Sequence, residues 1–215
     1  MSNRIDGTNS ADYLVGTEGE DRIRGKDGND HIYGLGGDDR IRGDDGDDYI
    51  YAGSGDDRVR GGDGNDLVYG EDGNDRLRGN DGDDELIGGA GDDVLNGDSG
   101  NDILTGSNPS VFDSGFEELD VLSGGSGGDI FVLGDSFEAY YNGDGLNGFV
   151  TITDFDYTEG DKFLVYDSGN INDYTVNAAG TEIFFQGDLI AVVEGTTPVI
   201  PVIDPVGFSG DFIFA

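Results

Sequence analysis

The chain has 215 residues, of which 47 are acidic and 11 basic, giving a formal net charge of −36 at pH 7, and it contains no cysteine. This excess of negative charge makes nucleic acid an implausible partner for most of the surface. Without cysteine no disulfide can staple the fold. No apolar run is long enough to cross a membrane, and residues 1–16 lack the apolar core of a signal peptide, so export through the Sec pathway is not expected.

A nine-residue unit repeats ten times without insertion over residues 16–105. Three columns are fixed: the fourth residue is Gly, the sixth is Asp, and the eighth is Ile, Val or Leu. Such a periodic apolar column argues against a disordered Gly/Asp tract. Without a bound cation, however, we expect the chain to be disordered. An EF-hand is disfavoured because strand-like triplets, not helices, flank the acidic runs.

Each column predicts a physical role. Glycines at the first and fourth positions allow positive φ angles and therefore a tight turn. The sixth-position Asp adds a carboxylate to backbone carbonyls in that turn, and Ca²⁺ prefers shells made only of oxygen. The last three residues alternate in the way a short strand does, with one apolar side chain pointing inward. Because one unit cannot bury that side chain alone, neighbouring units must stack.

The units resemble the RTX (hemolysin-type) GGxGxDxUx nonapeptide repeats of bacterial proteins exported by type I secretion. The resemblance implies an all-β, right-handed parallel β-roll with two units in each coil. It also implies several Ca²⁺ ions between stacked turns, held by sixth-position Asp side chains and by carbonyls of the first four positions. The implied carboxylate ligands are Asp21, Asp30, Asp39, Asp48, Asp57, Asp66, Asp75, Asp84, Asp93, Asp102, Asp120 and Asp129. The implied turn glycines are Gly19, Gly28, Gly37, Gly46, Gly55, Gly64, Gly73, Gly82, Gly91 and Gly100.

The roll is predicted to span residues 1–133. Residues 7–15 form a degenerate first unit that caps it, because terminal repeats need a closed outer face. Residues 106–114 form a degenerate turn in which Val111 replaces the Asp and a calcium site is lost. The repeat register is expected to continue across this turn, because Asp120 follows Asp102 by the length of two units.

A β-rich capping segment is predicted over residues 134–197. Strand-like stretches occur at 150–155, 162–166, 174–176, 181–185 and 189–194. The extended tail, residues 198–215, ends in Asp211 followed by three apolar residues. This ending resembles the C-terminal signal of type I secretion substrates, and the alternative is an ordinary last strand.

The outward positions seven and nine of the units differ between the two expected sheets. One sheet collects Arg22, Arg24, Arg40, Arg42, Arg58, Arg60, Arg76 and Arg78, and the other collects Tyr33, Tyr49, Tyr51 and Tyr69 together with Tyr13 and His31. If arginine served only to balance charge near the acidic turns, it would occur on both sheets. Its restriction to one sheet therefore indicates a functional role. We expect these residues to form an assembly face in which one molecule's arginines pack on the next molecule's tyrosines.

An enzyme is not expected, because one His, no Cys and no nucleophile or zinc motif are present. The sequence predicts a secreted, extracellular or surface-associated calcium-binding structural protein that folds on Ca²⁺ and self-assembles into a filament, sheath or surface layer. The type I secretion machinery would be a partner. The alternative is a calcium-dependent adhesin or matrix protein that binds anionic surface polysaccharide through the arginine face.

Overall fold

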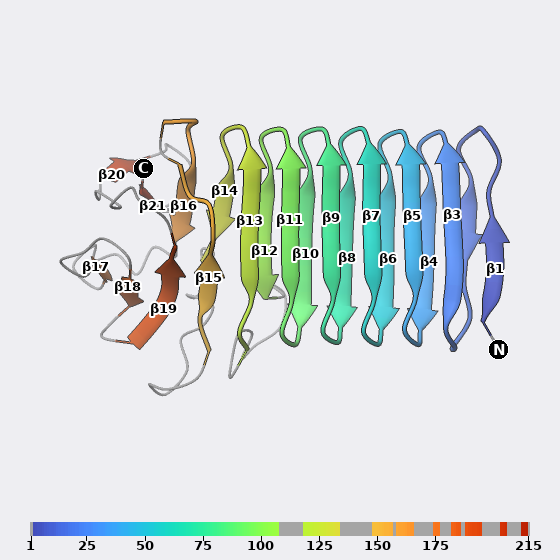
Figure 1. Ribbon diagram of the computed structural model, residues 1–215, viewed down its shortest axis with the longest axis horizontal. Helices are drawn as coiled ribbons and strands as arrows, with labels where there is room; N and C mark the ends of the chain where they lie inside the picture. Colours follow the sequence, from blue (N-terminus) through green and yellow to red (C-terminus); the bar gives the residue numbers. More distant parts are fainter. Residues whose placement is uncertain are drawn as a thin grey trace.

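The computed structural model describes residues 2–107, 118–133, 148–156, 158–165, 174–176, 182–185, 188–194, 203–205 and 212–214. Within these residues every regular element is a strand, and the strands form two long facing sheets (Figure 1). The predicted all-β class is confirmed.

The first sheet, sheet A, carries the odd-numbered strands of the repeat region. Its members are β1 (Asn3–Asp6), β3 (Asp21–Asp27), β5 (Arg40–Asp45), β7 (Arg58–Asp63), β9 (Arg76–Asp81), β11 (Val94–Ser99), β13 (Val121–Ser126), β15 (Val150–Ile152), β19 (Asp188–Val193), β18 (Glu182–Phe185) and β17 (Tyr174–Val176).

The second sheet, sheet B, carries the even-numbered strands of the repeat region. Its members are β2 (Tyr13–Val15), β4 (His31–Gly36), β6 (Tyr49–Ser54), β8 (Leu67–Asp72), β10 (Glu85–Ala90), β12 (Ile103–Ser107), β14 (Ile130–Val132), β16 (Lys162–Val165), β21 (Phe212–Phe214) and β20 (Ile203–Pro205).

Two repeat units make one coil. Each strand of the repeat array pairs in parallel with the strand two units later, as Ile23 does with Ile41 in sheet A and Ile32 with Ile50 in sheet B. In Figure 1 the near strands run upward, the far strands run downward, and the chain advances from right to left, so the coil is right-handed. The parallel β-roll predicted from the repeat is therefore confirmed.

The register changes after β12. Val94 of β11 pairs with Val121 of β13, and Ile103 of β12 pairs with Ile130 of β14, so these partners are separated by three unit lengths instead of two. The expectation that the two-unit spacing continues across residues 106–114 is wrong. Despite the longer spacing, β11 and β13 are direct neighbours in sheet A, and β12 and β14 are direct neighbours in sheet B. Val111, where a lost calcium site was predicted, lies outside the described residues.

Parallel pairing continues beyond residue 133 through β15, β16 and β19, and then gives way to antiparallel pairs. β18 runs antiparallel to β19, and β21 antiparallel to β16. All five stretches predicted as strands between residues 150 and 194 contain one. The division at 133 and 197, the capping role and the export signal stay predictions; Asp211 lies outside the described residues, whereas Phe212–Phe214 form β21.

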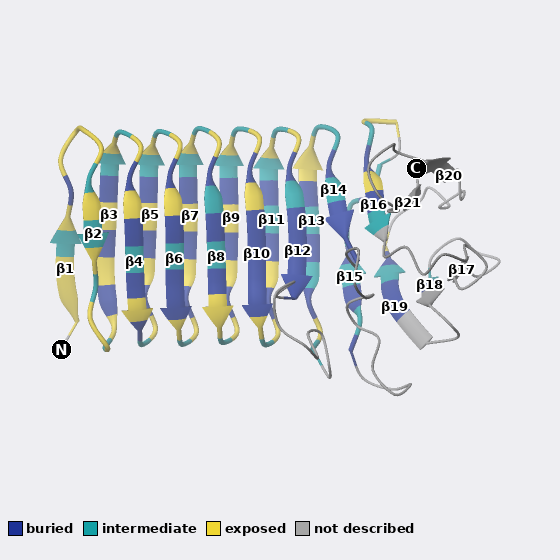
Figure 2. Cartoon of the chain, turned by 180° about the vertical axis from the view of Figure 1, so that it is seen from behind, coloured by how far each residue is buried: buried dark blue, intermediate teal, exposed yellow. Residues whose placement is uncertain are grey.

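The core of the repeat array consists of two rows of apolar side chains between the sheets, one row from each sheet. The eighth-position residues of the array, from Ile23 to Leu104, are at most 2% exposed. Figure 2 shows the same arrangement as a buried band across the middle of the sheet B strands. Each unit buries about one such side chain, which stabilises the fold by about 1.5–3 kcal/mol. Since ordering one residue's backbone costs about 1–2 kcal/mol, this narrow core needs a further source of stability.

Candidate metal centre

The turns between strands are shaped by the second and fourth positions of each unit. In the unit beginning at Gly25, Lys26 has φ +92° and Gly28 has φ +113°, and the same pair of left-handed residues recurs along the array. Glycine at the fourth position is explained by this conformation, as predicted, in nine of the ten units; Gly19, in the first unit, does not have a positive φ. The first-position glycine is not explained by this conformation, because Gly25 does not have a positive φ.

The first-position glycine instead makes room for oxygen. A Cβ on Gly70 would begin 2.3 Å from Oδ2 of Asp75 in the same unit and 2.4 Å from the carbonyl oxygen of Gly88 in the next coil. These contacts are closer than any real Cβ tolerates, so a side chain at Gly70 would displace the carboxylate or the neighbouring carbonyl. The first column therefore brings oxygens from two stacked turns close together.

All twelve Asp residues predicted as ligands are buried, with 3% exposure or less. From Asp30 to Asp102, Oδ1 of each repeat Asp holds the coils in register by accepting the backbone N–H of the Asp one coil earlier, whereas Oδ1 of Asp21 accepts the N–H of Asn3. Asp48 accepts from Asp30 at 2.7 Å and Asp66 accepts from Asp48 at 2.8 Å. After the register change, Asp120 accepts from Asp93, and Asp129 accepts from Asp102.

In most of these residues the second carboxylate oxygen is buried and has no hydrogen-bond partner within the part of the chain that the structure describes. This holds for Oδ2 of Asp30, Asp39, Asp48, Asp57, Asp66, Asp75, Asp84, Asp93, Asp102 and Asp129. An unpaired buried carboxylate is strongly unfavourable, so such groups normally pair with a cation or coordinate a metal. Among the described residues no three acidic, His or Cys side chains converge on one point, so a cation here would draw on backbone carbonyls as well.

The row of free oxygens is closed at both ends by protein groups. Oδ2 of Asp21, also predicted as a ligand, accepts hydrogen bonds from the backbone N–H and the hydroxyl of Thr17, at 2.6 and 2.9 Å. At the other end, Oδ2 of Asp161 accepts the N–H of Asp156 at 2.7 Å. The structure therefore distinguishes Asp21 from the ten Asp residues whose Oδ2 is free.

Burial shifts the titration of this column upward. It raises the pKa of Asp39 to about 7, of Asp66 to about 8 and of Asp93 to about 9, and neighbouring carboxylates add to the effect. At Asp21, burial would also raise the pKa, but hydrogen bonds from Thr17 and Asn3 outweigh it and lower the value. The middle of the row resists holding unpaired negative charge at neutral pH, whereas a divalent cation would favour the ionised form.

Two features escaped the sequence prediction. Asp161 continues the buried Asp column, because its Oδ1 accepts the N–H of Asp129 at 2.9 Å. The spacing from Asp161 to the buried Phe163 matches the Asp-x-apolar pattern of the repeat, and this signal could have found it. Asp154 accepts backbone N–H groups of Gly124 and Gly125, thereby completing a turn of the roll from outside the array.

A second ladder runs along the turns at the fifth position, which is Asn or Asp in nine of the ten units. Its side chains accept the N–H of the residue one coil later, as Asp47 does from Asn65 and Asn65 from Asp83, both at 2.9 Å. The sixth-position ladder accepts from the coil before. Because the two ladders point in opposite directions, each turn is tied to both neighbours.

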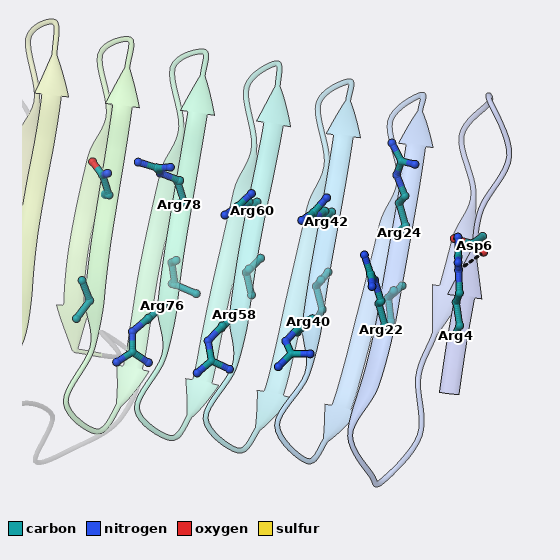
Figure 3. A pocket seen from close by; sticks show the side chains of 16 residues that line it. Arg4, Asp6, Arg22, Arg24, Arg40, Arg42, Arg58, Arg60, Arg76 and Arg78 are labelled. Atoms are coloured by element: carbon teal, nitrogen blue, oxygen red, sulfur yellow. Dashed lines mark hydrogen bonds and ion pairs between the residues drawn. The ribbon is translucent and has the colours of Figure 1, made fainter. Parts of the chain in front are cut away.

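The outward faces of the two sheets differ as predicted. The eight arginines of the array all lie on β3, β5, β7 and β9 of sheet A, and Figure 3 shows them in two rows across these strands. On sheet B, Tyr33 stacks on Tyr51 and Tyr51 on Tyr69, with ring centroids 5.1 and 4.8 Å apart and planes within 4° of parallel. His31 and Tyr49 form a second stack with centroids 5.0 Å apart.

These features define a class: a parallel β-roll whose stacked turns hold a row of buried, unpaired carboxylate oxygens. Residues 6–41, 33–68 and 69–104 match the family of the RTX calcium-binding nonapeptide repeat (4 copies). The array is thus a run of RTX calcium-binding nonapeptide repeats. The comparison with curated proteins found no match. Among the described residues, no helix is long and apolar enough to span a membrane.

Proposed function

We propose that this protein is a secreted calcium-binding structural protein whose β-roll folds on Ca²⁺ and then self-assembles outside the cell. The ten free Oδ2 atoms support the calcium requirement, because each would leave a costly unpaired group in a calcium-free roll. With so little apolar surface to bury, the free energy of calcium binding becomes the free energy of folding. Calcium would be held by the Oδ2 row and by turn carbonyls.

The observation that carries the assembly proposal is the separation of the two faces. Arginine rows and aromatic rows both cross their sheets at the strand spacing, about 4.8 Å, so the two patterns are commensurate. If a neighbouring molecule lay with its roll axis parallel, the arginines of each strand could contact the aromatic residues of one strand of the neighbour. Because the two surfaces differ, such a contact repeats without closing and builds a filament, sheath or layer.

The aromatic stacks define how the contact would form. The faces of Tyr51 are occupied by Tyr33 and Tyr69, so a partner molecule could contact only its ring edges and hydroxyl group. A neighbour's guanidinium groups would then donate hydrogen bonds to the tyrosine hydroxyls and lie over the exposed edges and strand backbone. The sequence suggested that a guanidinium stacks on a ring face. Such stacking could occur only at the terminal rings of each stack, which have a free face.

Secretion fits the same physics. In a cell compartment low in calcium, the acidic chain repels itself and stays extended, which suits export through a type I channel with a signal in residues 198–215. Outside, calcium fills the turns and the roll forms. The function we propose is not enzymatic, and the alternative, an adhesin for anionic polysaccharide, would need the arginine face alone.

The test is a calcium titration of the purified protein followed by circular dichroism and negative-stain microscopy. We expect a disorder-to-β transition that is accompanied by filaments or sheets. In the variant with Arg40, Arg42, Arg58 and Arg60 replaced by Ser, the transition should persist while assembly is lost. Unchanged assembly in this variant would exclude the arginine face, and the absence of any β transition would exclude calcium-driven folding.

A further inference from the structure

A groove runs between the two arginine rows of sheet A (Figure 3). One wall is the seventh-position row and the other is the ninth-position row. The floor is the strand segment between them, where side chains such as Ile41 and Val59 point into the core. Guanidinium groups thus border a channel that crosses the strands and follows the long axis of the roll.

The groove is finite. Before β3, Arg4 is paired with Asp6 at 2.8 Å, and after β9 the same two rows continue with Val94 and Asn96, which carry no charge. Four strands therefore carry the unbroken cationic part, which is about 14 Å long at the usual strand spacing. The protein's formal net charge is −36, so this arginine patch is a local concentration of positive charge on an otherwise acidic chain.

Most of these arginines form no ion pair with a residue that the structure describes. Arg24 forms an ion pair with Asp44, and Arg78 forms one with Asp98 at 2.6 Å, in each case with the next strand of sheet A. The residue that corresponds to these partners is Gly62 for Arg42 and Asn80 for Arg60. Among the described residues, six arginines are without an ion pair: Arg22, Arg40, Arg42, Arg58, Arg60 and Arg76. In the described part of the chain, the ninth-position row therefore forms ion pairs at its two ends, at Arg24 and Arg78, and none at Arg42 and Arg60 in the middle.

We propose that this groove binds a linear anionic polysaccharide that lies along the roll axis, with Arg42 and Arg60 as its main contacts. A guanidinium offers paired N–H donors that match carboxylate and sulfate groups. Guanidinium groups recur on every strand, a spacing of the same order as one sugar ring in an extended chain. A slender polymer fits between the acidic turns that flank sheet A, whereas a nucleic acid duplex is wider and would place phosphates against those turns.

This inference does not depend on self-assembly, because it uses the arginine face only. A variant with Tyr33, Tyr51 and Tyr69 replaced by Thr should lose assembly and keep polymer binding. In that background the protein stays monomeric, so binding is measured without competition from neighbouring molecules. Failure of assembly and failure of polymer binding are therefore separate results.

The experiment measures binding of the calcium-loaded Tyr33→Thr, Tyr51→Thr, Tyr69→Thr protein to dextran sulfate, carboxymethyl dextran and uncharged dextran by biolayer interferometry. We expect the two charged polymers to bind, with affinity that falls as salt rises, and plain dextran not to bind. Adding Arg42→Gln and Arg60→Gln should weaken binding about tenfold or more, the expected effect of losing charge-assisted hydrogen bonds.

Two further variants make the test specific. Arg24→Gln with Arg78→Gln is the matched control, because these arginines already have acidic partners, and it should change affinity far less. Asn80→Asp should weaken binding while retaining every arginine, because it gives Arg60 the partner that Asp98 gives Arg78. Circular dichroism in calcium confirms that each variant is folded. If binding survives Arg42→Gln with Arg60→Gln, calcium bridges the polymer to acidic turns and the proposal is overturned; equal binding of plain dextran also overturns it.

Discussion

At the scale of single residues, one amino acid serves two different purposes in this repeat. Fourth-position glycines such as Gly64, with φ +128°, are needed for their backbone conformation. First-position glycines such as Gly61 are needed because a side chain would collide with the sixth-position carboxylate, here at 2.0 Å from Oδ2 of Asp66. The array has one natural departure, Ala52, which stands in the first position of its unit and is fully buried.

Gly61→Ala is expected to raise the calcium concentration at the midpoint of folding. The added methyl must displace the Asp66 carboxylate from its buried position, which corresponds to overpacking by about 1–3 kcal/mol. Gly19→Ala is the control, because a Cβ there meets nothing within 4 Å. Calcium titration monitored by circular dichroism compares the two. Equal midpoints would show that the first column is not a steric requirement of the carboxylate row.

At the scale of an element, each strand contributes one buried apolar residue while each turn contributes one buried carboxylate. The strands are too short and the core too narrow to hold a coil alone, so alignment comes from the turns. There, Oδ1 of the sixth-position Asp fixes the coil before, and the fifth-position side chain fixes the coil after. The elements are therefore registered by polar ladders more than by apolar packing.

Without calcium, the roll is expected to be less stable at pH 8 than at pH 4. Folded-state pKa values rise to about 6 at Asp75 and to about 9 at Asp93, whereas an unfolded Asp has a value of about 3.9. The folded state therefore binds more protons, its stability is fully retained below about pH 4, and it is lost as pH rises through the folded values. Circular dichroism of chelator-treated, dilute protein across this range measures the effect. More β structure at pH 8 than at pH 4 would contradict it.

At the scale of the whole molecule, the two-unit coil places the arginines and the tyrosines on opposite sheets. Because every second unit returns to the same sheet, arginine on alternate units becomes a cationic face and tyrosine on the others becomes an aromatic face. The sheet on which a unit lies depends on whether that unit is odd or even in the series. The separation does not depend on any contact between the two faces. A change of one unit would redistribute the faces while preserving every turn.

Deleting residues 43–60, one full coil, should preserve the segregation, calcium-dependent folding and assembly, with about two calcium ions fewer per molecule. Deleting residues 43–51, one unit, should also preserve folding, because the turns still stack. It would, however, place the downstream arginines on sheet B and so abolish assembly. Calcium stoichiometry and electron microscopy of the two deletions provide the measurement. Assembly by the shorter deletion would mean that segregated faces are not required.

The sequence alone determined the roll, because Gly, Asp and apolar columns at a nine-residue period have no other arrangement that buries the eighth residue. It also predicted the Asp column and the placement of arginine and tyrosine on opposite sheets. Both follow from the nine-residue period and from two units in each coil. It could not show that the first glycine is steric, that Thr17 and Asp156 close the ends of the oxygen row, or that Asp120 stacks on Asp93. Thr17 and Asp156 each meet an Asp of their own turn, which depends on a local backbone conformation that the residue types alone do not specify. The stacking of Asp120 on Asp93 and the collision at the first glycine involve atoms of neighbouring coils, so only the tertiary structure decided them.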